Sequence, residues 1–386
     1  MKYFFWAALC ALLLLACRDE QLVIPGEETQ VDSVRSDVDY LGFYLLNEGN
    51  MGSNKATLDF FNFKTGIYQK NIYAAINPNV PKELGDVGND LKIYGSKLYA
   101  VINASNKVEV MEAATARRIS QIDIPNCRYI TFHEGYAYIT SYAGPVEINP
   151  DYAQKGYVAK VDTATLREVA RCIVGYQPDE LEVAGSKLYV ANSGGYRGAG
   201  STEGYERTVS VVDLATFREE KRIDVDYNLH RIRKDSRGDL WVSSRGDYQA
   251  NPGRLLVVDA KSEQVTDTFD LAASNFCIVG DSLYALAVQW SNVSFTNEIE
   301  YAIVNTRTRT LVTRNFITDG THQQLELPYG ILVHPHTREV FVADAGNYVS
   351  PGQLYCFDAA GKKKWSITAG DIPAHFALLN STNSKK

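Results

Sequence analysis

The chain has 386 residues, and its 46 acidic side chains outnumber its 39 basic ones to give a formal net charge of −7. No basic stripe occurs along the sequence, which argues against nucleic acid as a partner. A single domain of this length exceeds the usual range for one hydrophobic core. This favours a repeat architecture, because each repeat then packs only on its neighbours.

The N-terminus predicts export. Lys2 precedes an apolar run that ends at Ala16 and is too short to span a membrane, which is typical of a signal peptide over residues 1–16. The run ends LLAC, which resembles the lipobox of bacterial lipoproteins and implies that Cys17 is lipidated and anchors the chain to a membrane. A plain signal peptide followed by a chance cysteine is the alternative.

The residues after Cys17 predict the destination of the anchored protein. Asp19 and Glu20 resemble the signal that sends some lipoproteins to the outer face of the outer membrane, so we expect the protein on the extracellular side. Residues 21–40 are polar and lack periodicity. We therefore expect residues 17–40 to be the lipidated cysteine and a flexible tether.

From residue 41 onward one pattern recurs seven times. A short strand around an aromatic residue is followed by a loop and by an alternating strand that closes on Asp or Asn and a turn. The central aromatic recurs at roughly 40–57 residues, which is the period of a propeller blade. The seven aromatic segments begin at residues 42, 97, 136, 187, 239, 282 and 339.

Each aromatic strand has an apolar run before it and two further strands after it. One complete example is formed by residues 180–183, 187–190, 207–213 and 220–225. Four alternating strands in each of seven units predict an all-β fold, a seven-bladed β-propeller over residues 41–380.

A propeller ring must also be closed. Residues 371–379 read as the first strand of a blade that has no continuation, and residues 41–46 read as a second strand that has no predecessor. We expect these two segments to pair within one blade, because pairing the chain ends removes the edges that an open ring would expose.

The loops of one face have an unusual composition. In a propeller, the loops between second and third strands share a face with the links from blade to blade. Here these segments are long and rich in Tyr, Asn and Gly, whereas the opposite face has short turns such as Gly95-Ser96-Lys97. Tyr and Trp supply contact area, and Asn, Gln and Arg supply directed hydrogen bonds, so the long-looped face is predicted to bind a large, mostly uncharged ligand with many amides.

The candidate ligand-binding residues all lie in these loops or beside them. They are Asn47, Glu48, Asn50, Asp90, Asn103, Arg128, Tyr142, Asn192, Tyr196, His230, Arg245, Asp247, Tyr248, Gln289, Trp290, Tyr329, Asn347, Tyr348 and His375.

The signals for catalysis and for metal binding are weak. No GxSxG or HExxH motif occurs, the six histidines are scattered, and no CxxC spacing indicates zinc, so we expect neither an enzyme nor a metal site. One enzyme alternative remains, a calcium-dependent lactonase-type propeller whose ligands would be Glu48, Asp90, Asn103, Asp179 and Asn192. Four cysteines of the expected domain, Cys127, Cys172, Cys277 and Cys356, are predicted to be small buried residues, with a disulfide left open.

Several segments resemble one family. LNEGNMGSN at 46–54, GDVGND at 85–90, VANSGGYR at 190–197, SRGDY at 244–248 and GDIPAHF at 370–376 are similar to the BtuG family of surface cobalamin-binding lipoproteins. The likeness covers nearly all of residues 41–379, and its shorter motifs recur in the broader group of YncE-like propellers. The resemblance implies a seven-bladed propeller that captures cobalamin (vitamin B12) and passes it to a TonB-dependent, BtuB-like outer-membrane transporter.

Two hypotheses of different class follow. In the first, a non-catalytic capture protein uses Asn47, Asn192, Arg128, Arg245 and Gln289 to pair the amides and phosphate of a corrinoid, while Tyr142, Tyr196, Tyr248, Trp290 and Tyr348 cover its apolar edges. In the second, the propeller is an interaction scaffold of another surface complex, or binds a glycan. A titration with cyanocobalamin separates the two.

Overall fold

The structure is a computed structural model that describes residues 26–35, 39–80, 84–146, 149, 151–198, 204–291 and 295–383. The expected signal peptide, Cys17 and the acidic pair lie outside this part of the chain. In the described part, no helix is both long enough and apolar enough to cross a membrane. The four cysteines from Cys127 to Cys356 are free thiols, and all but the half-buried Cys277 are buried.

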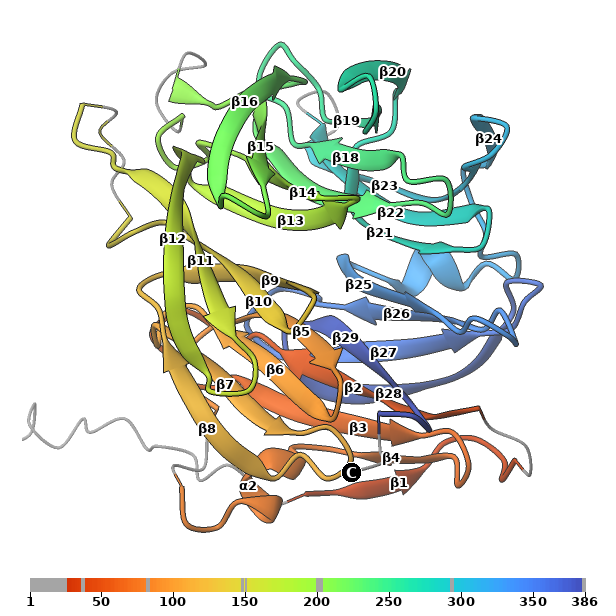
Figure 1. The fold of residues 1–386 in the computed structure, drawn as a ribbon. Coiled ribbons are helices and arrows are strands. Elements are labelled where there is room, and N and C mark those ends of the chain that lie inside the picture. Colours follow the sequence, from red (N-terminus) through yellow and green to blue (C-terminus); the bar gives the residue numbers. More distant parts are fainter. Residues whose placement is uncertain are drawn as a thin grey trace, which may run out of the picture.

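The described residues form seven antiparallel sheets arranged around a ring, so the predicted seven-bladed β-propeller is confirmed (Figure 1). From its innermost strand outward, the closing sheet contains β29 (Pro373–Asn380), β2 (Tyr40–Asn47), β3 (Thr57–Asn62), β4 (Ile67–Gln69) and β1 (Glu28–Gln30). In the same order, the next three sheets are β5 (Gly88–Tyr94), β6 (Lys97–Ile102), β7 (Lys107–Glu112) and β8 (Arg118–Asp123); β9 (Cys127–His133), β10 (Tyr136–Ser141), β11 (Lys155–Asp162) and β12 (Arg167–Tyr176); and β13 (Pro178–Ala184), β14 (Lys187–Asn192), β15 (Thr208–Asp213) and β16 (Arg218–Asp224). The last three sheets are β17 (Leu229–Lys234), β18 (Leu240–Ser244), β19 (Arg254–Asp259) and β20 (Gln264–Phe269); β21 (Ala273–Val279), β22 (Ser282–Ser291), β23 (Thr296–Asn305) and β24 (Thr310–Thr313); and β25 (Pro328–Val333), β26 (Val340–Asp344), β27 (Pro351–Phe357) and β28 (Lys363–Asp371). Two short helices, α2 (Ile72–Ile76) and η2 (Thr321–Gln324), lie in the links between blades.

The hydrophobic core lies between the blades. Tyr99 and Val110 of one blade pack against Ile130 and Ile139 of the next, and all four side chains are buried. Similar clusters occupy the other interfaces between neighbouring blades. The middle strands of a blade therefore bury both faces, which explains their runs of Val, Ile, Leu and Tyr.

The Asp or Asn that ends the third strand has a clear role. In six blades its side-chain oxygen accepts hydrogen bonds from backbone N–H groups of the following turn, as when Asp162 accepts from Thr165 at 2.7 Å. A short acceptor side chain replaces the bonds that the turn cannot make for itself. The polar residue seen in the repeat is thus a requirement of the turn to the outermost strand.

The ring is closed by the predicted pairing of the chain ends. β2 pairs with β29 along its length, for example Tyr44 opposite Ala377, and Figure 1 shows the two strands side by side, one near each end of the colour scale. The closing blade packs on the last blade through aromatic rings, with 4.8 Å between the ring centroids of Phe43 and Phe341.

The N-terminal boundary differs from the expectation. Residues 28–30, which we assigned to a flexible tether, form β1 and pair with β4 as a fifth strand. Ion pairs between side chains hold the segment in place, in addition to strand pairing. Arg35 donates two hydrogen bonds of 2.7 Å to the carboxylate of Glu339, and Lys364 donates to Asp32 at 2.8 Å. We call these four residues the N-terminal clasp, because they join residues 32–35 to the last blade.

The clasp makes stability depend on pH. Burial alone would raise the pKa of Glu339, but hydrogen bonds from Arg35 and Lys364 outweigh it and lower the pKa to about 2 from an ordinary 4.5. A carboxyl group with a lowered pKa in the folded state stabilises the fold above its unfolded pKa, and this contribution is lost as the pH falls toward the folded value.

Arg35→Ala should therefore lower the free energy of unfolding by about 1–3 kcal/mol at pH 7. The difference from the native chain should shrink between about pH 4.5 and pH 2, where Glu339 becomes protonated in the folded state. Urea unfolding at several pH values measures it, with the exposed Arg117→Ala as the control. A deficit that stays constant down to pH 3 would contradict the ionic role of the clasp.

Candidate functional site

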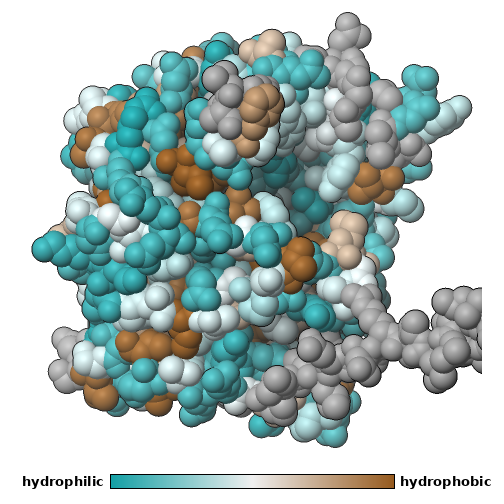
Figure 2. Space-filling model, turned by 180° about the vertical axis from the view of Figure 1, so that it is seen from behind, coloured by the Kyte–Doolittle hydropathy of each residue, from teal (hydrophilic) through white to brown (hydrophobic). Residues whose placement is uncertain are grey.

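A single large cavity opens on the long-looped face. Its volume is about 1080 Å³, and its lining comes from five consecutive blades, the β9 to β12 blade through the β25 to β28 blade. The loops after β10, β14, β18 and β26 and the start of the inner strands contribute most of the lining. The face drawn in Figure 2 is mostly hydrophilic, with hydrophobic residues in small separate groups.

Residues in the left-handed backbone conformation precede the inner strands at this face. Val87, Asn126, Gln177, Asn228 and Ile372 each have positive φ, between 44° and 58°, and each immediately precedes an inner strand. The left-handed turn reverses the chain in a single residue, and Asn adopts it more readily than most residues. The first residues of the inner strands are thereby placed at the cavity end of the ring.

The floor of the cavity is organised around the fully buried Asp179, on β13. Its carboxylate accepts hydrogen bonds from the Tyr142 hydroxyl at 2.7 Å, from His230 Nδ1 at 3.0 Å and from Arg245 at 3.1 Å, and Arg128 Nε lies 3.5 Å away. Burial alone would raise the pKa of Asp179, but His230, Arg245 and Arg128 hold it well below its ordinary value. Asp179 is therefore ionised and joins residues of three adjacent blades.

These contacts also determine the state of His230. Arg245 can only donate, so His230 Nε2, 3.1 Å from its guanidinium, must be an acceptor, and the ring proton is on Nδ1 facing Asp179. Burial and the charges of Arg245 and Arg231 lower the pKa of His230 well below its ordinary value, in agreement with a neutral ring. Both ring nitrogens are thus engaged within the protein, and His230 acts as a spacer between Asp179 and Arg245.

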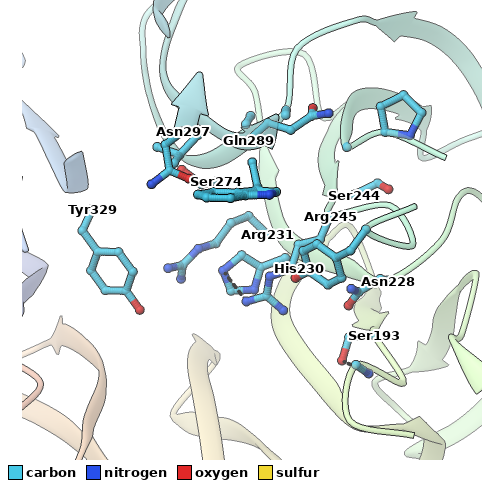
Figure 3. A pocket seen from close by; sticks show the side chains of 18 of the residues that line it. Ser193, Asn228, His230, Arg231, Ser244, Arg245, Ser274, Gln289, Asn297 and Tyr329 are labelled. Atoms are coloured by element: carbon cyan, nitrogen blue, oxygen red, sulfur yellow. Dashed lines mark hydrogen bonds between the residues drawn. The ribbon is translucent and has the colours of Figure 1, made fainter. Parts of the chain in front are cut away.

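Two buried polar atoms without partners belong to residues that line the cavity. Nε of Arg231 and Oδ1 of Asn228 are buried and have no hydrogen-bond partner among the residues that the structure describes, and both residues line the cavity. Figure 3 shows the Arg231 guanidinium extending into the open space between His230 and Tyr329. Buried polar groups of this kind are costly unless something satisfies them.

Aromatic side chains stand around the mouth of the cavity. Tyr196, Tyr248, Trp290 and Tyr348 line it and remain between 40% and 63% exposed, which is unusual for large aromatic residues. We call these four residues the aromatic rim. Three of them make edge-to-face ring contacts, Tyr196 with Tyr142, Tyr248 with Tyr205 and Tyr348 with Tyr329.

About half of the residues proposed from the sequence line this cavity. They are Arg128, Tyr142, Tyr196, His230, Arg245, Tyr248, Gln289, Trp290, Tyr329 and Tyr348. Gln289 and Trp290 were expected in a loop but belong to β22, because the β22–β23 hairpin is long and pairs Trp290 with Asn297.

The other proposed residues brace the fold outside the cavity lining. Asn47 donates to Asp59 at 2.9 Å, Asp90 accepts from the backbone of Ile130, and Asn103 donates to Asn126. These side chains are buried because the loops need internal hydrogen bonds where the backbone turns away from its strands.

The same applies to a second group of proposed residues. Asn192 accepts from Gly175 N–H and donates to Ser210, and a Cβ on Gly175 would lie only 2.4 Å from the Asn192 side chain. Asp247 and Asn347 accept backbone N–H groups of their own loops.

The remaining three proposed residues lie toward the closing blade. Glu48 accepts from Tyr329 at 3.3 Å and pairs with His375 at 2.9 Å. The half-buried Asn50 accepts from Ser53 through its backbone oxygen.

Sequence reasoning missed other parts of the lining. Arg231 follows a proposed residue directly, and Ser193, Asn228, Ser274 and Asn297 are small polar residues at strand ends. Arg231 could have been identified from its place near the start of an inner strand, because a charged side chain is unexpected in a strand that the fold buries.

The five positions of the calcium alternative make contacts with other residues of the protein, Glu48 with Tyr329 and His375 among them. Asp179 is surrounded by Arg128, Arg245 and His230. Asp90 accepts from Ile130 and Asn103 donates to Cys127, both on β9 of the next blade, and Asn192 donates to Ser210 of its own blade. Among the described residues, no group of three or more His, Cys, Asp or Glu side chains is arranged to hold a metal ion.

A family model described as a domain of unknown function, DUF5074, matches residues 41–376. The chain belongs to that family. Its match begins at the first strand of the ring after β1 and ends within β29, so it covers the propeller. A search of the curated proteins finds no match to the chain.

Solved structures share the fold at low sequence identity. A quinoprotein alcohol dehydrogenase-like protein from Bacteroides thetaiotaomicron has a TM-score of 0.56 and 12% identity, over 89% of this chain and 79% of that one. Hydrazine synthase from Kuenenia stuttgartiensis has a TM-score of 0.54 and 15% identity, over 70% of this chain and 76% of that one. The Pan2 WD40 domain of Neurospora crassa has a TM-score of 0.53 and 9% identity, over 77% of this chain and 86% of that one. At these identities the likeness concerns the propeller architecture alone.

Asp179→Asn should lower the free energy of unfolding by about 3–5 kcal/mol, because it removes the fully buried counter-charge of the partly buried Arg128 and Arg245. Chemical unfolding measures the loss. Asp270→Asn makes the same chemical change at a carboxylate that is 92% exposed, and it should have little effect. Equal stability of the two variants would contradict the role of Asp179 as the central counter-ion.

Proposed function

We propose that this protein is a surface-anchored capture protein that binds cobalamin and related corrinoids in the cavity of the long-looped face and passes them to a TonB-dependent outer-membrane transporter. The observation that carries the proposal is the cavity itself. Its volume, about 1080 Å³, lies just above the roughly 300–1,000 Å³ typical of small-molecule sites, which suits a large ligand.

The chemistry of the lining supports this class of ligand. A corrinoid presents a flat ring system edged by methyl groups and amides. The aromatic rim offers apolar surface with polar tips, and Gln289, Asn297 and Asn228 offer amide groups for directed hydrogen bonds. The similarity of the loop motifs to the BtuG family points to the same ligand.

Binding without catalysis accounts best for the polar groups of the floor. The one histidine of the cavity is neutral and has both ring nitrogens engaged, and the one fully buried carboxylate holds three basic side chains. Such groups are positioned to hold the cavity in a fixed shape.

Substitutions in the aromatic rim test the ligand site. Trp290→Ala and Tyr348→Ala should each weaken cyanocobalamin binding by about tenfold or more, because a large aromatic at the centre of an interface typically contributes about 2 kcal/mol. Titration calorimetry and the visible spectrum of the corrinoid measure the change. Lys97→Ala, in a turn of the opposite face, is the control, and EDTA should leave binding unaltered.

Two results would count against the proposal. The corrinoid assignment is wrong if the native protein gives neither heat nor a spectral change with cyanocobalamin. The scaffold alternative would then be preferred, and a loss of binding on adding EDTA would favour the calcium alternative.

The anchor has its own test. Cys17→Ala should move the protein from the membrane fraction to the soluble fraction, because the signal peptide offers no second anchor. Cys10→Ala changes a cysteine that leaves with the signal peptide and should not alter fractionation. Replacing Asp19 and Glu20 by Ala should keep the protein on the membrane but reduce its digestion by protease added to intact cells; unchanged digestion would contradict the surface-export signal.

A further inference from the structure

Positive charge gathers in the cavity of an acidic protein. Three guanidinium groups line it, Arg128, Arg231 and Arg245, while the chain as a whole has a formal net charge of −7. Two of the three share Asp179 as their counter-ion. The third, Arg231, is only 4% exposed, and its guanidinium takes part in none of the ion pairs of the described residues.

Two nearby carboxylates are occupied elsewhere, and a third is exposed. Glu180 holds Arg233 at 3.1 Å and accepts from the backbone of Ile232 at 3.0 Å. Glu48 accepts from Tyr329 and His375, and Glu326 is exposed on the lining. The Arg231 guanidinium lies over the face of the Tyr129 ring, with its central carbon 5.0 Å from the ring centroid. A ring face attracts the cation without satisfying its N–H donors.

We propose that Arg231, reinforced by the charges of Arg128 and Arg245, forms an oxyanion subsite in the floor of the cavity that binds a phosphodiester or carboxylate group of the ligand. Three facts carry this inference. The guanidinium is buried, its Nε has no hydrogen-bond partner among the described residues, and it points into the cavity (Figure 3). Guanidinium groups present paired N–H donors that match the oxygens of phosphate and carboxylate.

This inference rests on the proposed function for the identity of the ligand and refines it. A complete cobalamin carries one phosphodiester, in the loop that joins the nucleotide to the corrin ring, and cobinamide lacks it. The subsite therefore predicts that the protein distinguishes the two. The corrin ring and its amides contact the aromatic rim in both, and only cobalamin supplies the anion for Arg231.

The experiment compares two ligands and three proteins by titration calorimetry. Arg231→Gln, which removes the charge but keeps a similar size, should weaken cyanocobalamin binding by about tenfold to a hundredfold and dicyanocobinamide binding by less than about threefold. Arg307→Ala, the matched loss of an arginine that is 68% exposed and lies in a turn of the opposite face, should change neither affinity. Equal weakening of both ligands by Arg231→Gln, or of neither, overturns the subsite.

Two further measurements separate the subsite from the proposed function and from folding. If the native protein binds neither corrinoid, inorganic phosphate and acetate are titrated instead. If either anion binds the native protein but not Arg231→Gln, the subsite is supported while the corrinoid assignment fails, and the preferred anion identifies the chemistry of the subsite. If neither anion binds the native protein, the subsite is overturned. Should Arg231→Gln not fold, Arg231→Lys keeps the charge without the planar fork and should still weaken cobalamin more than cobinamide.

Discussion

The structure depends on one pairing, that of β2 with β29. Each of the other six sheets is built from a continuous stretch of chain, but the closing sheet takes its inner strand from the C-terminal end and its other strands from the N-terminal end. Because the core lies between blades, a gap at this point would expose two blade surfaces at once. The N-terminal clasp adds charge pairing across the interface with the last blade.

A closed ring makes a buried charge network possible. Asp179 is buried completely, yet it is ionised, because the two blades beside its own bring a histidine and two arginines to its carboxylate. No single blade supplies these partners. The network holds Arg245 and Tyr142 in place beneath the aromatic rim, so the shape of the cavity follows from how neighbouring blades pack and less from any one loop.

The sequence was sufficient for the fold and for the face that carries the cavity, because aromatic strands with a regular spacing report blade position and long loops report one face. Individual site residues were harder to predict. Asn103, Asn192 and Gln289 each lie at or near the end of the second strand of a blade, and a polar residue there either braces the fold or faces a ligand. Only packing decides between these roles. β1 escaped prediction because three polar residues give no period, and Arg231 because a strand pattern does not show which strand ends a cavity meets.

The spread of the cavity over five consecutive blades has a mechanical consequence. A molecule held there touches units that otherwise interact only with their immediate neighbours, and so it acts as a cross-link between blades that share no interface. Occupancy and the integrity of the ring are then thermodynamically linked, since any ligand that binds only the closed ring also resists its opening. The affinity for such a ligand and the added stability of the closed ring are then two expressions of one binding free energy.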